Sequence, residues 1–254
     1  MTVAIIRFPG SNCEQETLRA LTELNINATI IDWTQTTASL NDYSGFIIPG
    51  GFSFQDRVRA GVIAAQLPII DALKDQAINR QKPVLGICNG AQILVESGIL
   101  SIDTASDQLD AIIDANYVDG YATHFLCDWA FVKPFKASQC MFLNQFSDAD
   151  IIPIQVCHGE GRYLLSQSPT SGMNYCTIDG TVSDSYPVTP NGSQHALAAI
   201  SNQQGNVFAI MPHPERSINQ RRLPFSIQHK IATSGHRIAS WKPLFQTFKE
   251  GVYA

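Results

Sequence analysis

Short apolar runs rich in β-branched residues alternate with longer amphipathic stretches through the first hundred residues of the chain. The runs predict buried strands at residues 3–8, 28–33, 45–48 and 83–87. The stretches between them predict a helix over 11–24, capped by Ser11 or Asn12, and a helix over 60–80 that breaks near Pro68. Strands that alternate with helices in this way predict an α/β fold with a mostly parallel central sheet and helices on both faces.

The pattern weakens in the middle of the chain. Residues 101–120 are mostly acidic or small, and we predict an insertion there, followed by a strand before residue 136. Further elements are predicted downstream, as strands at 151–156, 196–200 and 207–210 and as a closing amphipathic helix over 241–252. No interdomain linker is evident, so we expect a single domain over residues 1–254.

The nine residues VLGICNGAQ, 84–92, have the pattern of a strand, a sharp turn and a helix, with Cys88 on the turn. Unpaired N–H groups and the helix dipole at such a position favour the thiolate, which is the nucleophilic form. Gly86 and Gly90 fit the close backbone packing of this turn. Taken alone, the motif fits a buried structural cysteine equally well.

A second group of chemically active side chains follows the predicted strand at 207–210, in the sequence MPHPER. Pro212 and Pro214 exclude a helix and predict an extended segment, so His213 and Glu215 project to the same side. A carboxylate beside an imidazole can fix its tautomer and stabilise its cation, as in a catalytic triad. The alternative is a solvated loop, which an isolated HPE sequence favours and the upstream Cys88 argues against.

Composition excludes several classes of function. The chain is 44% hydrophobic and 15% charged, with a net charge of −5 and no Lys/Arg-rich run, so we expect neither nucleic acid nor membrane as a partner. Six cysteines without a C-x-x-C pair predict no zinc site and no disulfide framework, and hence no metal in the active site. With no secretion signal evident, we expect a cytoplasmic protein.

The segments RFPGSNCEQE, PGGFSFQDRVRAG, GICNGAQ, HGEGRY, PNGS and MPHPER occur in this order along nearly the whole chain. Together they resemble the class I glutamine amidotransferases, and more narrowly the glutaminase subunits of phosphoribosylformylglycinamidine synthases, in purine biosynthesis. Two features depart from that family. The stretch 101–120 is longer than expected, and Asp128 stands where an arginine is usual; both bear on partner contacts more than on chemistry.

The resemblance implies a flavodoxin-like fold and a Cys-His-Glu triad that hydrolyses glutamine to glutamate and ammonia. Cys88 is similar to the family's nucleophile, His213 to its acid and base, and Glu215 to the residue that orients the histidine. The tetrahedral intermediate needs donors for its oxyanion, and the N–H of Asn89 and one from the turn at Gly51 and Phe52 are the candidates.

Other residues are predicted to form the glutamine pocket. Gln92 is expected to pack or hydrogen-bond near the substrate. The resemblance implies that HGEGRY is a loop that lines the pocket through His158, while the alternative is a structural turn held by Gly159 and Gly161. Asp56 belongs either to a solvated face or to a partner interface, and the sequence does not separate these two interpretations.

The resemblance also implies a larger synthetase subunit, and sometimes a small accessory subunit. The synthetase would convert formylglycinamide ribonucleotide to the amidine with ATP and take the ammonia by a protected route. The chain contains no G-x-x-x-x-G-K-[ST] loop. We therefore expect no cofactor in this chain, with ATP and magnesium on the partner.

Rival interpretations keep the fold and change the role. They are a glutaminase subunit of a different amidotransferase, a stand-alone γ-glutamyl hydrolase or related enzyme, and a catalytically idle regulatory scaffold.

Overall fold

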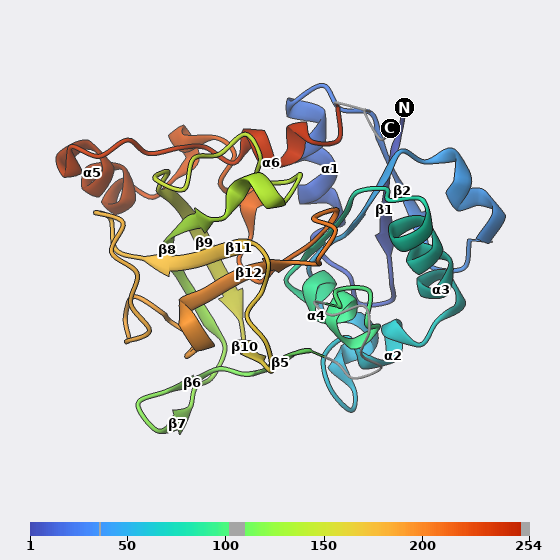
Figure 1. The fold of residues 1–254 in the computed structure, drawn as a ribbon, viewed down its shortest axis with the longest axis horizontal. Helices are drawn as coiled ribbons and strands as arrows, with labels where there is room; N and C mark the ends of the chain where they lie inside the picture. Colours follow the sequence, from blue (N-terminus) through green and yellow to red (C-terminus); the bar gives the residue numbers. More distant parts are fainter. Residues whose placement is uncertain (36, 102–109, 250–254) are drawn as a thin grey trace.

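A central sheet of mixed direction organises the chain. The computed structural model describes residues 1–35, 37–101 and 110–249, and within them nine strands form one sheet in the order β2-β1-β3-β4-β13-β12-β11-β8-β9 (Figure 1). Five neighbouring strands are parallel: β2 (Ala28–Asp32), β1 (Val3–Arg7), β3 (Gly45–Ile48), β4 (Val84–Ile87) and β13 (Val207–Ile210). The remaining four are antiparallel: β12 (Leu197–Ser201), β11 (Gly172–Cys176), β8 (Leu126–Phe135) and β9 (Ile152–His158).

The parallel half matches the sequence prediction closely. Every residue of β3, β4 and β13 is buried, as expected for strands covered on both faces. Helix α1 (Glu14–Glu23) contacts β1 and β2, and α4 (Asn89–Glu96) contacts β3, β4 and β13. Figure 1 shows α1 to α4 gathered around the parallel strands, with the antiparallel strands and α5 on the other side of the molecule.

The predicted helices are confirmed with changes at their ends. The break at Pro68 separates α2 (Val62–Ala65) from α3 (Pro68–Lys74), and a π-helical turn follows α3. Helix α1 begins after Cys13, so the predicted cap at Ser11 or Asn12 is wrong. The Ser11 hydroxyl instead accepts a hydrogen bond from the Phe8 N–H at 3.0 Å, which stabilises the turn after β1.

Two helices near the C-terminus differ from the prediction. The closing helix α6 covers only Lys242–Gln246, while residues 250–252 of the predicted helix lie outside the described residues. Helix α5 (Phe225–Ser234) was not predicted, because only Ile227 of its residues is buried and no apolar stripe marks it. Within the described residues, no helix has both the length and the apolar composition needed to cross a bilayer.

The predicted insertion contributes to the core where the structure describes it. Residues 102–109 lie outside the described residues, but β5 (Ala111–Ala115) pairs antiparallel with β10 (Glu160–Leu165). Ala111 and Ile113 of β5 are buried. A small hairpin, β6 (Tyr117–Val118) with β7 (Tyr121–Ala122), follows β5.

The candidate site residues lie at the carboxyl ends of three neighbouring strands. Strands β3, β4 and β13 are parallel neighbours, so their carboxyl ends meet at one edge. The Gly50–Gly51 turn follows β3, Cys88 follows β4, and His213 lies three residues after β13. The far edge strand also returns to this place, because the His213 N–H donates to the Gln155 carbonyl of β9 at 2.8 Å.

Candidate active site

Cys88 occupies a strained turn between β4 and α4. It is the N-cap of α4, with φ +51° and ψ −109°, a conformation that non-glycine residues rarely adopt. Its N–H donates to the Ile210 carbonyl at 2.8 Å, which fixes the turn against β13. A Cβ on Gly90 would lie 2.0 Å from the Ile48 carbonyl oxygen, and one on Gly86 would lie 2.6 Å from that of Gly90. The structure thus has the elbow that the sequence predicted.

His213 and Glu215 meet in a buried pair after β13. Their side chains are joined by a hydrogen bond of 2.6 Å between Nδ1 and Oε1, and both residues are buried. The extended backbone predicted for this segment is wrong, since Pro214–Arg216 forms a 3-10 turn. Proline suits the first position of such a turn because its φ is preset and it needs no N–H acceptor.

Cys88 and His213 both lie against Gly50. A Cβ on Gly50 would be 2.8 Å from Cε1 of His213 and 3.4 Å from Cβ of Cys88, so only glycine fits between them. Burial by itself would lower the pKa of His213, but the Glu215 carboxylate and hydrogen bonds with the Cys88 and Cys13 thiols raise that pKa well above its usual value. The site therefore favours the imidazolium form of His213.

A cavity of about 100 Å³ opens beside Cys88 and collects most of the predicted pocket residues. It is lined by Gly51, Phe52, Asp56, Cys88, Gln92, Phe125, Cys157, His158, Gly159 and Glu160. Asn89 holds two neighbouring segments together. Its Oδ1 accepts a hydrogen bond from the Ser53 N–H, and its Nδ2 donates one to Oε1 of Gln92, both at 3.0 Å. The structure therefore brings together residues from the turn after β3, from α4 and from the end of β9, which are far apart in sequence.

Backbone amides close to Cys88 in the chain or in the fold are the candidate oxyanion donors. The Asn89 N–H is the first amide of α4 and has no acceptor within the helix. In the glycine turn, the Phe52 N–H is already used, because it donates to the Gly10 carbonyl at 2.9 Å. That leaves the Gly51 N–H as the candidate amide from this turn. Gly51 has φ +152°, and a Cβ there would lie 2.6 Å from Cα of Ser11.

His158 is held as a neutral ring. Burial, followed by the charge of His213, lowers its pKa to about 3. Its Nδ1 lies 3.1 Å from Oδ1 of Asn116, and its ring occupies the space that a Cβ on Gly161 would need. The loop implied for HGEGRY is wrong, because His158 ends β9 and Glu160 begins β10, with a bend at Gly159. A neutral His158 cannot serve as a second acid near pH 7.

Two carboxylates in the cavity were not predicted as site residues. Asp56 and Glu160 both line it, and burial together with the charge of Glu160 raises the pKa of Asp56 to about 6. Asp56 reaches the cavity because Phe54, Gln55 and Asp56 all have positive φ. Three consecutive left-handed residues have no signature in the pattern of apolar positions, so the sequence left the place of Asp56 open.

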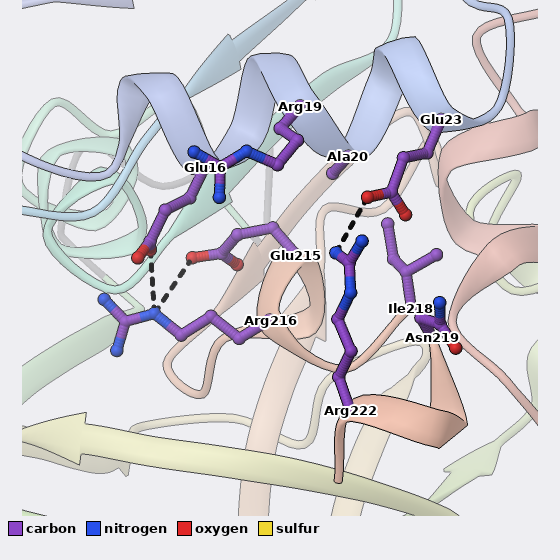
Figure 2. Close-up of a pocket in the computed structure, with 9 residues that line it drawn as sticks. All are labelled: Glu16, Arg19, Ala20, Glu23, Glu215, Arg216, Ile218, Asn219 and Arg222. Carbon is purple, nitrogen blue, oxygen red and sulfur yellow. Dashed lines mark hydrogen bonds and ion pairs between the residues drawn. The ribbon is translucent and has the colours of Figure 1, made fainter.

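Cys13 and Arg216 were also missed. The Cys13 sulfur accepts a hydrogen bond from Nη2 of Arg216 at 3.3 Å. The Nε of Arg216 lies 2.8 Å from Oε2 of Glu16 and 3.9 Å from Oε1 of Glu215 (Figure 2). Glu16, Glu215 and Arg216 border a second cavity, of about 190 Å³, which lies between α1 and the segment after β13.

Comparison with known proteins identifies the class. The family model of the CobB/CobQ-like glutamine amidotransferase domain matches residues 1–251, and the chain belongs to this family. Its curated relatives include phosphoribosylformylglycinamidine synthase subunits PurQ. That of Methanothrix thermoacetophila is 37% identical over 88% of this chain and 89% of the relative. That of Saccharolobus solfataricus is 36% identical over 85% of this chain and 89% of the relative.

A solved structure agrees with this placement. The structure of PurLQS from Thermotoga maritima contains a chain that superimposes with a TM-score of 0.74 and 29% sequence identity. The match covers 98% of this chain and 97% of that one. The fold and the predicted family are therefore confirmed over almost the whole sequence.

The raised pKa of Asp56 predicts a pH-dependent stability. A folded pKa of about 6 lies above the ordinary value of about 3.9, so the folded protein binds more protons than the unfolded chain between these values. Stability from this group is present at low pH and falls as the pH rises through that window. Asp56→Asn should therefore raise Tm near pH 7 and change it little near pH 4, as measured by thermal unfolding.

The exposed Asp71 on α3 offers a matched control carboxylate. An Asp71→Asn variant that showed the same difference between the two pH values would contradict the assignment to Asp56.

Proposed function

We propose that this chain is the glutaminase subunit of a phosphoribosylformylglycinamidine synthase. It hydrolyses glutamine to glutamate and ammonia and passes the ammonia to a synthetase subunit, which converts formylglycinamide ribonucleotide to the amidine with ATP. The observation that carries the proposal is the Cys88 thiol at its elbow, in contact with the ring of His213, which Glu215 holds at 2.6 Å. The PurQ relatives support the choice of this synthase.

The triad divides the reaction into two steps. In the first, the Cys88 thiolate attacks the side-chain amide carbon of glutamine, His213 gives a proton to the leaving nitrogen, and ammonia departs from a glutamyl thioester. In the second, His213 takes a proton from water, the hydroxide attacks the thioester, and glutamate leaves as the Cys88 thiolate re-forms. Glu215 holds the proton on Nδ1 throughout, so that the other ring nitrogen serves the reaction.

The oxyanion of each tetrahedral intermediate would be stabilised by two backbone amides. The N–H groups of Asn89 and Gly51 are the candidates, one from the start of α4 and one from the turn after β3. Loss of one such donor costs roughly 100 to 1,000 fold in rate in other enzymes. The tight fit of Gly51 against Ser11 keeps its amide in a fixed direction.

Asp56 and Glu160 would recognise the α-ammonium group of glutamine. That group is the one cation of the substrate, and two carboxylates that share a cavity gain most from a cation between them. Burial, and after it the charge of Glu160, raises the pKa of Asp56, and a cation between the two carboxylates would relieve that repulsion. Gln92 is held by Asn89 and by the Glu160 carbonyl at 2.7 Å, so it would position the pocket wall and take no part in the chemistry.

The chemistry of ammonia favours a docked partner. Ammonia released into water near pH 7 is mostly protonated and loses its nucleophilicity, so it needs a shielded route to its acceptor. Phe52 and Phe125 line the cavity and are 44% and 52% exposed. They would be covered by the synthetase subunit, with or without a small accessory subunit, and ATP and magnesium would bind on that partner.

We also propose a cytoplasmic location. All six cysteines are free thiols, and the proposed mechanism needs Cys88 reduced. Reducing compartments maintain thiols in this state.

Cys88→Ala should abolish glutamine hydrolysis without unfolding the chain. Loss of a triad nucleophile lowers kcat by roughly ten-thousand-fold or more in a well-studied hydrolase, while removing one small side chain at a turn leaves the core intact. A coupled glutamate assay measures the rate, and far-UV circular dichroism checks the fold. The exposed Cys127 gives the control variant Cys127→Ser. Retained activity in Cys88→Ala would reject the triad.

Asp56→Asn should raise the KM for glutamine more than it lowers kcat. Losing a charge-assisted contact typically costs 1.5 to 3 kcal/mol, or about 10 to 100 fold in KM. The variant should also lose its preference for glutamine over glutaramate, the analogue that lacks the α-amino group. An unchanged preference would show that the ammonium group binds elsewhere.

Glutamine hydrolysis should rise when the matching synthetase subunit and its nucleotide ligands are added to the purified chain. The partner closes the cavity mouth and completes the arrangement around Cys88. A stand-alone γ-glutamyl hydrolase would show one rate in both conditions. An idle scaffold would show no hydrolysis in either, and Cys88 would resist alkylation by a diazo-ketone analogue of glutamine.

A further inference from the structure

A thiol outside the triad lies against its histidine and its carboxylate. Cys13 precedes α1 and is 2% exposed. Its sulfur, a ring nitrogen of His213 and a carboxylate oxygen of Glu215 all lie within 4.8 Å of one another. The mechanism proposed above uses His213 and Glu215 but gives Cys13 no role. This buried sulfur therefore needs a separate explanation.

The three side chains supply the ligand atoms that zinc prefers. A thiolate sulfur, an imidazole nitrogen and a carboxylate oxygen are the usual protein ligands of Zn²⁺, and three of them leave a fourth position for water. The second carboxylate oxygen of Glu215, Oε2, is buried and has no hydrogen-bond partner among the described residues. Glu215 thus retains a free acceptor at the centre of the cluster.

The local charges suit a divalent cation. The thiolate of Cys13 and the carboxylate of Glu215 together carry two negative charges, which balance Zn²⁺. Burial raises the pKa of the Cys13 thiol, while His213 and Arg216, the latter 3.3 Å from the sulfur, act in the opposite direction. Glu16, at 2.8 Å from Nε of Arg216, neutralises that guanidinium. The arginine therefore helps to ionise the ligand without adding a net charge to the site.

One cavity adjoins the cluster. Glu215 and Arg216 line the cavity of about 190 Å³ against α1 that Figure 2 shows. An ion that enters this cavity meets one of the three proposed ligands.

We propose that Cys13, His213 and Glu215 form an inhibitory Zn²⁺ site. The metal takes no part in the chemistry. Binding releases to solvent the Cys13 thiol proton and the proton of the His213 ring nitrogen that takes the metal. A ring nitrogen that binds the metal cannot carry a proton, so His213 no longer serves as acid and base. The inhibition rests on the proposed function, whereas the metal site does not.

Direct binding is tested in the Cys88→Ala background, which removes the nucleophile as a ligand. Co²⁺ is the probe, because a cobalt–thiolate bond gives a charge-transfer band in the near ultraviolet. We expect the band at one Co²⁺ per chain, its loss on adding Zn²⁺, and its absence in Cys88→Ala/Cys13→Ser. The control pair Cys88→Ala/Cys127→Ser should keep it. No band in Cys88→Ala, or a band that survives Cys13→Ser, would overturn the site.

A second variant covers a folding failure of Cys13→Ser. Cys88→Ala/Glu215→Gln keeps the thiol and loses the anionic oxygen ligand. It should retain the charge-transfer band but bind Co²⁺ at least about tenfold more weakly, since even second-shell losses cost roughly 10 to 100 fold in metal affinity. An unchanged affinity would remove Glu215 from the site and contradict the proposal.

Inhibition is tested with Cys88 intact. Zn²⁺ should inhibit glutamine hydrolysis reversibly, with recovery on adding EDTA. In Cys13→Ser the half-inhibitory concentration, measured against that variant's own uninhibited rate, should rise at least about tenfold. Equal sensitivity would mean that Cys88 and His213 bind zinc without Cys13, which contradicts the proposal. A chain without glutaminase activity would defeat the proposed function and leave the cobalt result to decide the metal site.

Discussion

The close contact between α4 and the end of β3 is the constraint on which the site depends. Gly90 packs so near the Ile48 carbonyl that a single Cβ would fall 2.0 Å from its oxygen. This contact leaves Cys88 no room to relax from φ +51°, and its N–H is held by β13. The strain at Cys88 is thus supported by the packing of three neighbouring strands. Because those strands are parallel, the segments that follow them lie at the same edge of the sheet. The Gly50–Gly51 turn and His213 therefore lie beside Cys88.

Two buried histidines show how the hydrogen-bond partner of an imidazole decides whether the ring is cationic or neutral. His213 and His158 are each 2% exposed, so both lose the hydration that favours an imidazolium. His213 faces a carboxylate at 2.6 Å and is raised in pKa, whereas His158 faces an amide oxygen at 3.1 Å and is lowered to about 3. A fixed anion compensates for burial and a neutral acceptor does not. The site can therefore hold one cationic ring beside one neutral ring.

The parts predictable from sequence are those that local pattern or a resemblance could reveal. The strands at 45–48 and 207–210 match their predictions residue for residue, because continuous apolar runs between turns have few alternatives. The elbow at Cys88 followed from its flanking glycines. Helix α5 escaped prediction, since only one of its residues is buried. The turn at Pro214 was wrongly predicted as extended, because a proline fits both an extended segment and the first position of a 3-10 turn.

Contacts made only by tertiary packing could not be predicted. Nothing near Cys13 in the sequence indicates that Arg216 will lie 3.3 Å from its sulfur, because the two residues meet only when α1 packs beside the segment after β13. Asp56 is similar, since its direction depends on three left-handed residues in a row. Residue spacing likewise could not reveal the proposed zinc site, because its ligands, Cys13, His213 and Glu215, come from opposite ends of the chain. Such features belong to the assembled fold and have no local signature.

The hydrogen bond from the His213 N–H to Gln155 has a consequence for the outer edge of the sheet. Strand β9 ends the strand order, and an unpaired edge of this kind invites pairing with another chain. The segment after β13 covers part of that edge, through the bridge between His213 and Gln155. Loss of β9 from the sheet would expose the edge and release the backbone of His213 together. Protection against self-association and the position of His213 therefore depend on the same strand.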